Sequence, residues 1–247
     1  MRNLKFILPA IAMMAFVSSC SHNDEPTPKP DEPTGKAFKG IIFAAGITNP
    51  EGNSGSVYMQ SLPDMVAGNY DNSNGIPVGF GTAPIVAKSG NIYVLPDYMG
   101  NTKAEITRYR IYSDNKWHKK GALQIPPKAA ACCVTELNSE KAYVSLQGLG
   151  SIIVFNPTTM TRIAEIDLNG LKQADTNVSP ASMVIRDGKL FVGLNQMNAQ
   201  YMPARNNIEL AVIDTKTDKV EKHIVNTSLE MSFATRPIDH FQRMGYV

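Results

Sequence analysis

The chain lacks several features that assign many proteins to a class at once. Its 247 residues include three cysteines, four histidines and one tryptophan. No segment shows a sustained helical period with caps, which argues against a helical fold. It contains no HExxH motif, no CxxC pair and no glycine-rich phosphate loop, so the common zinc, redox and nucleotide sites have no support in the sequence.

An excess of charge of one sign is also absent. The formal net charge is +2, and it is close to zero without Arg2 and Lys5 at the start of the chain. Without a basic stripe, nucleic acid is not an expected partner. The apolar run at 6–17 is shorter than the ~20 residues that a helix needs to span a bilayer. We therefore expect no transmembrane helix here.

The beginning of the chain predicts a lipid anchor. Basic residues precede the run 6–17, and Val17-Ser18-Ser19 lead to Cys20. This order is typical of a secretory signal, and the cysteine after the small residues resembles a bacterial lipoprotein signal. The resemblance implies a signal peptide over 1–19 that is removed and a lipid on Cys20. A plain secretory signal cut near Ser19 is the alternative.

Residues 20–36 predict a tether. After Cys20 the segment reads SHNDEPTPKPDEPTGK, with four prolines and almost no apolar side chain. Such a composition cannot bury a core, so we expect an extended, solvated chain. Its acidic residues resemble a surface-export signal of some Gram-negative lipoproteins. This implies an outer-membrane protein that faces the cell exterior, with the periplasmic side as the alternative.

The folded part, 37–247, consists of repeated β-rich units. Ile92, Ala142 and Leu190 begin equivalent apolar runs and lie 50 and 48 positions apart. In the last unit, Asp187-Gly188 between two apolar runs predicts a hairpin. A repeat of ~40–50 residues made only of strands is typical of propeller blades. A β-sandwich is the alternative, but sandwiches do not repeat at this length.

The sequence thus predicts an all-β fold, a β-propeller with about four blades present. The segment before residue 38 supplies no clear innermost strand for the first blade, and 240–247 carries no strand pattern. Propellers close with about 4–8 blades. We therefore expect either a small closed propeller or an incomplete part of a larger one, truncated at its C-terminus.

The chain resembles the Gram-negative surface lipoproteins that have a β-propeller domain and are encoded beside TonB-dependent receptors. The resemblance rests on Cys20, the tether, and the runs 40–46, 55–58 and 234–239. It implies that the protein captures a ferric siderophore, an anionic chelate, for a TonB-dependent receptor. The residues themselves offer no catalytic constellation, so we expect no catalytic residue and no cofactor. Full-size members have more blades, which implies an incomplete part of an about seven-bladed propeller.

Candidate ligand-binding residues lie in the loops between strands two and three and at the blade junctions. Arginine can pair with an anionic ligand through two parallel donors, tyrosine can stack on a ring, and amide and thioether groups suit an adaptable surface. The candidates are Tyr98, Gln196, Met197, Tyr201, Arg205 and Arg236.

Two other functions stay open. A lactonase-like, metal-dependent hydrolase needs inward-facing oxygen ligands, for which Glu209 and Asp97 are candidates by type. A non-catalytic interaction scaffold is the other. His118 and His223 fall on outer strands, where we expect solvated edge residues. Cys132-Cys133 has no distant partner, and we expect both to be buried in a strand.

Overall fold

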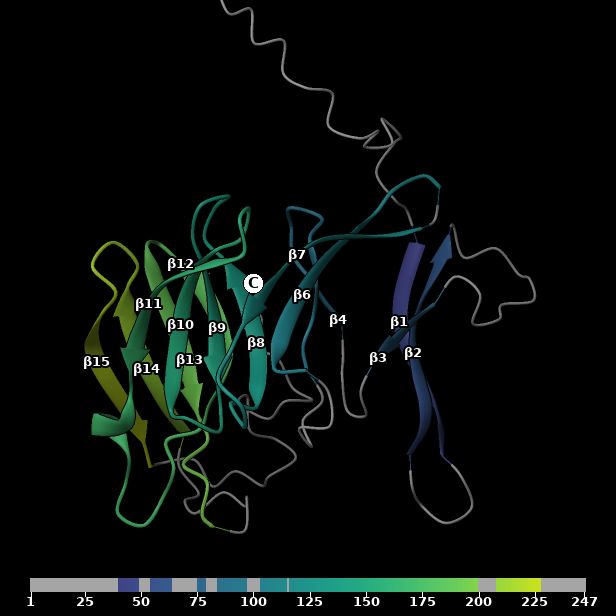
Figure 1. Ribbon diagram of the computed structural model, residues 1–247. Coiled ribbons are helices and arrows are strands. Elements are labelled where there is room, and N and C mark those ends of the chain that lie inside the picture. The colour runs from purple at the N-terminus through teal and green to yellow at the C-terminus, as the bar shows by residue number, and fades with distance from the viewer. Residues whose placement is uncertain are drawn as a thin grey trace, which may run out of the picture. The chain divides into compact units, whose positions relative to one another are not determined.

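A computed structural model of the protein describes residues 40–48, 54–63, 75–78, 84–96, 103–114, 116–199 and 208–227 (Figure 1). All of them belong to the unit Gly35–Val247. The predicted signal peptide, the anchor at Cys20 and the tether lie outside the described residues, so they stay predictions. Within the described ranges, no helix is long and apolar enough to cross a membrane.

The described residues form four antiparallel sheets, in each of which every strand pairs with its neighbour in the sequence. We number the sheets as blades 1 to 4. Blade 1 contains β1 (Gly40–Thr48), β2 (Ser54–Pro63) and β3 (Ile76–Val78). Blade 2 contains β4 (Pro84–Val86), β5 (Ile92–Val94), β6 (Glu105–Ile111) and β7 (Trp117–Gln124). Blade 3 contains β8 (Ala131–Glu136), β9 (Ala142–Leu146), β10 (Ser151–Asn156) and β11 (Thr161–Asp167). Blade 4 contains β12 (Pro180–Arg186), β13 (Lys189–Leu194), β14 (Ile208–Asp214) and β15 (Lys219–Asn226).

Consecutive four-stranded meanders are the blades of a β-propeller, so the predicted all-β propeller is confirmed. Ile92, Ala142 and Leu190 lie in the second strands of blades 2, 3 and 4, as their spacing predicted. The predicted hairpin at Asp187-Gly188 is confirmed too. Its φ angles of 49° and 73° are those of a type I′ turn, which matches the twist of the flanking strands.

The turn between strands three and four repeats in blades 3 and 4. Asn156 Oδ1 accepts the N–H groups of the second and third residues after it, and Asp214 Oδ1 does the same in blade 4. Each turn ends on a residue with a φ of 57°, Met160 or Asp218. A side chain that accepts from the backbone two residues on is the reason why Asn and Asp begin such turns.

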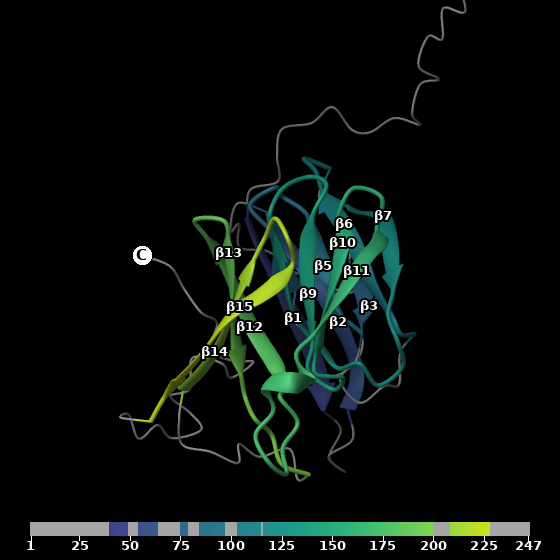
Figure 2. The ribbon, with the colours of Figure 1, turned by 90° about the vertical axis from the view of Figure 1, so that its left-hand side faces the viewer.

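Among the residues whose burial the structure describes, two apolar cores lie between the blades. One packs between blades 2 and 3, and the other between blades 3 and 4 (Figure 2 labels strands of all three blades). In β10, Ile153 points into the first core and Ile152 into the second, and both are fully buried. A strand that packs against an apolar core on each face needs apolar residues at every position. The uninterrupted apolar sequence of residues 152–155 meets this requirement.

The prediction for the two cysteines is confirmed in part. Cys132 and Cys133 lie in β8, the innermost strand of blade 3, but each is half-buried rather than buried. The pairing with β9 shifts register between Ala131 and Cys133. An extra residue in one strand of a pair bends that strand and disturbs its packing, which accounts for the partial exposure.

Candidate functional site

The connections between strands two and three and those between blades lie at one end of the sheets. In an antiparallel meander the chain leaves strand two and strand four in the same direction, so both kinds of connection gather at the same end. We name this end the loop face; its described residues are 125–130, 147–150, 168–179 and 195–199. It lies at the lower end of blades 3 and 4 in Figure 1, where the short 3-10 helix η2 (Asn169–Leu171) is drawn.

The loop face of blade 3 is built by backbone hydrogen bonds. The N–H of Gln147, the first residue after β9, donates to Ala130 O at 3.0 Å. The N–H of Gly148 donates to Ala129 O at 2.9 Å. These bonds hold the end of the second strand against the residues that enter the innermost strand.

Blade 4 repeats the arrangement with other residues. Asn195 N–H donates to Ser179 O at 3.1 Å, and Gln196 N–H donates to Val178 O at 3.2 Å. Gln147 and Asn195 therefore occupy equivalent positions. Because the same backbone contacts recur, differences between the two blades come from the side chains.

Left-handed backbone is concentrated at this face. Ala130 and Ser179, the residues just before the two innermost strands, have φ angles of 48° and 46°. A left-handed conformation costs a residue other than glycine roughly 1–3 kcal/mol, and such residues gather at functional sites. Five non-glycine residues of the loop face have positive φ: Lys128, Ala130, Asp175, Ser179 and Gln196.

The loops of blades 3 and 4 also contact each other directly. Asn177 Nδ2 donates to Gly148 O at 3.3 Å, and Asn169 Nδ2 donates to Leu149 O at 3.2 Å. A Cβ atom on Gly148 would lie 2.4 Å from Lys128 O, so only glycine fits there. The loop face is thus a continuous surface that spans two blades.

Gln196 holds the loop face together from inside. Its side chain is 1% exposed. Oε1 accepts Gln173 N–H at 3.0 Å and Thr176 Oγ1 at 2.8 Å, while Nε2 donates to Leu171 O at 3.0 Å and Glu209 Oε2 at 2.8 Å. A carboxamide has two donors and two acceptor positions. All of them are used within the chain, so none remains for a ligand.

Met197 is likewise buried, at 7% exposed, and its backbone pairs with Asn177 through bonds of 2.8 and 2.7 Å. The expectation that Gln196 and Met197 form an exposed, adaptable surface is therefore wrong. The hydrogen bonds of the preceding loop draw both side chains inward. The other predicted ligand-binding residues lie outside the described part of the chain, and their role stays a prediction: Tyr98, Tyr201, Arg205 and Arg236.

Glu209 has a position that the sequence does not reveal. It lies near the start of β14, the third strand of its blade, and is fully buried. Its Oε2 is 2.9 Å from His223 Nε2 and accepts from Gln196. Polar partners of this kind offset the loss of hydration of a buried carboxyl group. The bonds of Glu209 Oε2 are made within blade 4, while Asp97 lies outside the described residues, so the role of both as metal ligands stays a prediction.

The histidines on the outer strands differ from the solvated edge residues that we expected. His223 lies on β15 as predicted, but its side chain is only 23% exposed and pairs with Glu209. His118 lies on β7, also as predicted, and pairs with Asp114 at 2.8 Å. In the described ranges, no group of three or more His, Cys, Asp or Glu side chains is placed to hold a metal ion.

Gln147 is the residue of the loop face that sequence reasoning missed. Its side chain is 5% exposed, and its Nε2 has no hydrogen-bond partner among the described residues. The signal was present in the repeat, since Asp97, Gln147 and Asn195 are 50 and 48 positions apart and all polar. Packing of the apolar core does not require a polar residue at this position. Its recurrence in three units therefore indicates another role for the position.

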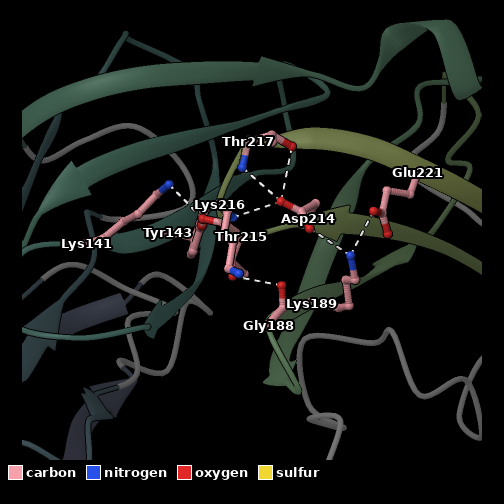
Figure 3. A network of polar contacts seen from close by, with 9 residues as sticks. All are labelled: Lys141, Tyr143, Gly188, Lys189, Asp214, Thr215, Lys216, Thr217 and Glu221. Atoms are coloured by element: carbon pink, nitrogen blue, oxygen red, sulfur yellow. Dashed lines mark hydrogen bonds and ion pairs between the residues drawn. The ribbon is translucent and has the colours of Figure 1, made fainter.

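A second polar network joins blades 3 and 4 at the opposite end of the sheets, and Figure 3 draws the part of it in which Lys141 and Tyr143 lie beside Thr215. Tyr143 Oη donates to Asp218 Oδ1 at 2.9 Å, and Lys141 Nζ lies 2.7 Å from Asp218 Oδ2 and 2.9 Å from Thr215 O. Burial and the Asp218 carboxylate raise the pKa of Tyr143 above its usual value. Every group in this network has a partner, which indicates a structural role.

Blade 2 is joined to blade 3 in the same manner. Tyr93, the counterpart of Tyr143 in β5, donates to Glu136 Oε1 at 2.5 Å, and Asn91 Nδ2 donates to the same oxygen at 2.7 Å. Burial and Glu136 raise the pKa of Tyr93. Tyr93 thus bonds blade 2 to an acidic residue of blade 3, and Tyr143 bonds blade 3 to one of blade 4. The loop face is left as the candidate site.

No protein-family model matches the chain, and no curated protein matches its sequence. Solved structures that are similar in fold include hydrazine synthase from Kuenenia stuttgartiensis, with 13% identity and a TM-score of 0.44 over 69% of this chain and 43% of that one. Apo AztD from Citrobacter koseri has 13% identity and a TM-score of 0.44 over 78% and 46%. Virginiamycin B lyase from Staphylococcus aureus has 12% identity and a TM-score of 0.43 over 75% and 56%.

The chain therefore spans only about half the length of these proteins. Similarity at this level does not transfer a function. The propeller assignment rests on the repeated four-stranded sheets of the chain itself.

Proposed function

We propose that this protein is a lipid-anchored β-propeller of the outer membrane that captures a ferric siderophore, or a similar anionic chelate, and transfers it to a TonB-dependent receptor. The observation that supports this best is the loop face, whose loops are bonded to one another and include left-handed residues in both blades. Loops that are ordered before a ligand arrives lose less conformational entropy on binding. Such a face suits capture of a ligand without chemical change.

The contacts to the ligand come from residues that border this face in the sequence. Tyr201 and Arg205 belong to the connection between β13 and β14. Gln196 and Glu209, which flank that connection, bond to each other. A ferric catecholate is anionic and has aromatic rings, so guanidinium groups pair with its oxygens and tyrosines stack on its rings. Arg205 and Arg236 supply the guanidinium groups, and Tyr98 and Tyr201 supply the stacking rings.

The anchor supports transfer rather than free diffusion. A lipid on Cys20 keeps the protein at the membrane that holds the receptor. The proline-rich tether of 20–36 extends by ~3.1 Å per residue in a polyproline conformation, which lets the propeller reach a neighbouring protein. The membrane and a TonB-dependent receptor are therefore the partners that we propose.

The test uses the full chain, purified from membranes in detergent. Equilibrium dialysis against the ferric complex of 2,3-dihydroxybenzoate, followed by its visible absorbance, measures binding. We expect saturable binding of the ferric complex and none of the metal-free acid. Hydrolysis of a lactone that requires a divalent cation would instead favour the hydrolase, and absence of both binding and turnover would favour a scaffold.

Substitution of the arginines tests the contacts. Arg205→Ala and Arg236→Ala should each weaken binding by roughly 1–3 kcal/mol, the value of a charge-assisted hydrogen bond. Arg162→Ala is the matched control, because Arg162 lies on the outer strand β11 and pairs with Glu165. Equal affinities for all three variants would place the ligand elsewhere.

A further inference from the structure

Gln147 Nε2 is a buried donor with no hydrogen-bond partner among the described residues. Gln147 follows β9, and its backbone is fixed by the bond to Ala130 O. Four buried side-chain atoms of the described residues have no hydrogen-bond partner there, and Gln147 Nε2 is the one in the loop face: Arg108 Nε, Trp117 Nε1, Gln147 Nε2 and Ser151 Oγ. A buried N–H group without a hydrogen-bond acceptor destabilises the fold. Such a group is therefore expected where a molecule outside the chain, such as a ligand or a water, accepts its hydrogen bond.

The side chains of β9, which ends at Leu146, alternate between the two neighbouring blades. Leu146 packs in the core between blades 2 and 3, whereas Ser145 Oγ donates to Ala181 O of blade 4 at 2.7 Å. Side chains two residues apart in a strand share a face. Gln147 follows directly at the end of β9, where its backbone N–H bonds to Ala130 O in the chain that enters β8.

The left-handed residues of blades 3 and 4 lie at the same end of the sheets as Gln147. Ala130, whose carbonyl accepts from Gln147, has a φ of 48°, and Ser179, at the equivalent place in blade 4, has a φ of 46°. Backbone strain and an unpaired donor coincide here. A left-handed residue other than glycine and a buried unpaired donor each lower stability. Their occurrence together is expected at a functional site rather than at a position with only a structural role.

We propose that Gln147 Nε2 donates a hydrogen bond to an oxygen of the ligand at the loop face and so contributes to specificity. This inference rests on the proposed function and specifies its chemistry. A ferric catecholate presents only acceptor oxygens, which a carboxamide N–H matches. The oxygens carry negative charge, so the bond is charge-assisted and stronger than a neutral one. The amide remains a donor at every physiological pH.

The test is a pair of substitutions in the full chain, with the ferric complex of 2,3-dihydroxybenzoate as the probe. Gln147→Met keeps the length of the side chain and removes the donor. We expect about tenfold weaker binding with an unchanged or higher melting temperature, because the variant no longer buries an unpaired N–H. Gln147→Glu should weaken binding more, since a carboxylate repels an anion.

Ser151→Ala is the matched control. Ser151 Oγ is also buried without a described partner, but Ser151 pairs with Leu146 and shares its side of blade 3. This variant should bind the probe as the unaltered chain does. Gln147→Met binding with the affinity of the unaltered chain overturns the inference. If its melting temperature is also lower, the amide has a structural role, such as a bond to a buried water. If the unaltered chain binds no probe, the proposed function fails and this inference fails with it.

Discussion

The hydroxyl of Tyr143 offers a direct measure of how strongly blades 3 and 4 hold together. Tyr143 is fully buried, and its hydroxyl donates to Asp218 Oδ1 at 2.9 Å across the blade boundary. Tyr143→Phe removes this bond and a longer contact of 3.4 Å from the same hydroxyl to Thr215 O. It keeps the ring, and Phe191 occupies the same position of β13 in blade 4. A phenylalanine ring therefore fits this position of a blade.

The expected loss follows from the groups that remain. A hydrogen bond to a charged acceptor contributes about 1.5–3 kcal/mol. After the substitution Asp218 still pairs with Lys141 at 2.7 Å, so its carboxylate is not left alone. We therefore expect the lower end of the range, a decrease of about 1.5 kcal/mol in the free energy of unfolding.

Urea unfolding of the two proteins measures this difference. The midpoint should decrease while the slope stays the same, since the surface exposed on unfolding hardly changes. Tyr109→Phe is the control: Tyr109 stacks edge-on against Trp117, and its hydroxyl bonds to no described residue. That variant should stay within about 0.5 kcal/mol of the unaltered protein. An equal effect of both variants would refute the role of the Tyr143 hydroxyl between the blades.

The pH dependence provides an independent check. Burial and Asp218 raise the pKa of folded Tyr143, whereas the unfolded side chain titrates near pH ~10. The unfolded chain then loses this proton before the folded protein does. The stability that the hydroxyl contributes is fully present below pH ~10 and decreases as the pH rises above it. Tyr143→Phe should show a smaller alkaline loss than the unaltered protein.

Three further predictions concern other parts of the chain. Gly148→Ala should lower stability by ~1–3 kcal/mol and weaken probe binding, because the new Cβ would lie 2.4 Å from a backbone oxygen, whereas Gly170→Ala, with nothing within 4 Å, should do neither. Hydrogen bonds from Lys103 and Gln124 lower the pKa of Glu105 to about 2. The stability that Glu105 contributes should therefore be present above pH ~4.5 and decrease toward pH 2 in an acid-unfolding series. Glu105→Gln should remove this pH dependence, and an acid profile identical to that of the unaltered protein would contradict the prediction. Cys20→Ala should release the protein from the membrane fraction, and retention at high salt would refute the anchor.

The blades could be predicted because their signals are local or strictly periodic. The apolar runs that begin at Ile92, Ala142 and Leu190 recur at nearly equal spacing, and Asp187-Gly188 needs only its own φ angles to form a turn. The side chains of Asn156 and Asp214 likewise form their turns with backbone two and three residues away. Such features depend little on the rest of the chain.

The candidate site could be predicted only in outline. The sequence placed it in the loops after the second strands and at the blade junctions, and this location stays a prediction. It did not predict that Gln196 is buried, because the acceptors and donors around this amide come from residues 13 to 25 positions away. His223 was expected in solvent because it lies on an outer strand. Its partner Glu209 is a diagonal neighbour whose position depends on the register of β14 and β15.

The sequence by itself therefore determined the strands, the turns and the number of residues in each blade, because these follow from apolar patterning and short-range hydrogen bonds. Only the tertiary structure decided which polar side chains are satisfied and which are not. Tyr143 finds Asp218 at a separation of 75 residues, while the Gln147 amide finds no described partner. Whether a polar group is buried and paired depends on how one blade stacks on the next, which the sequence of a single blade does not contain.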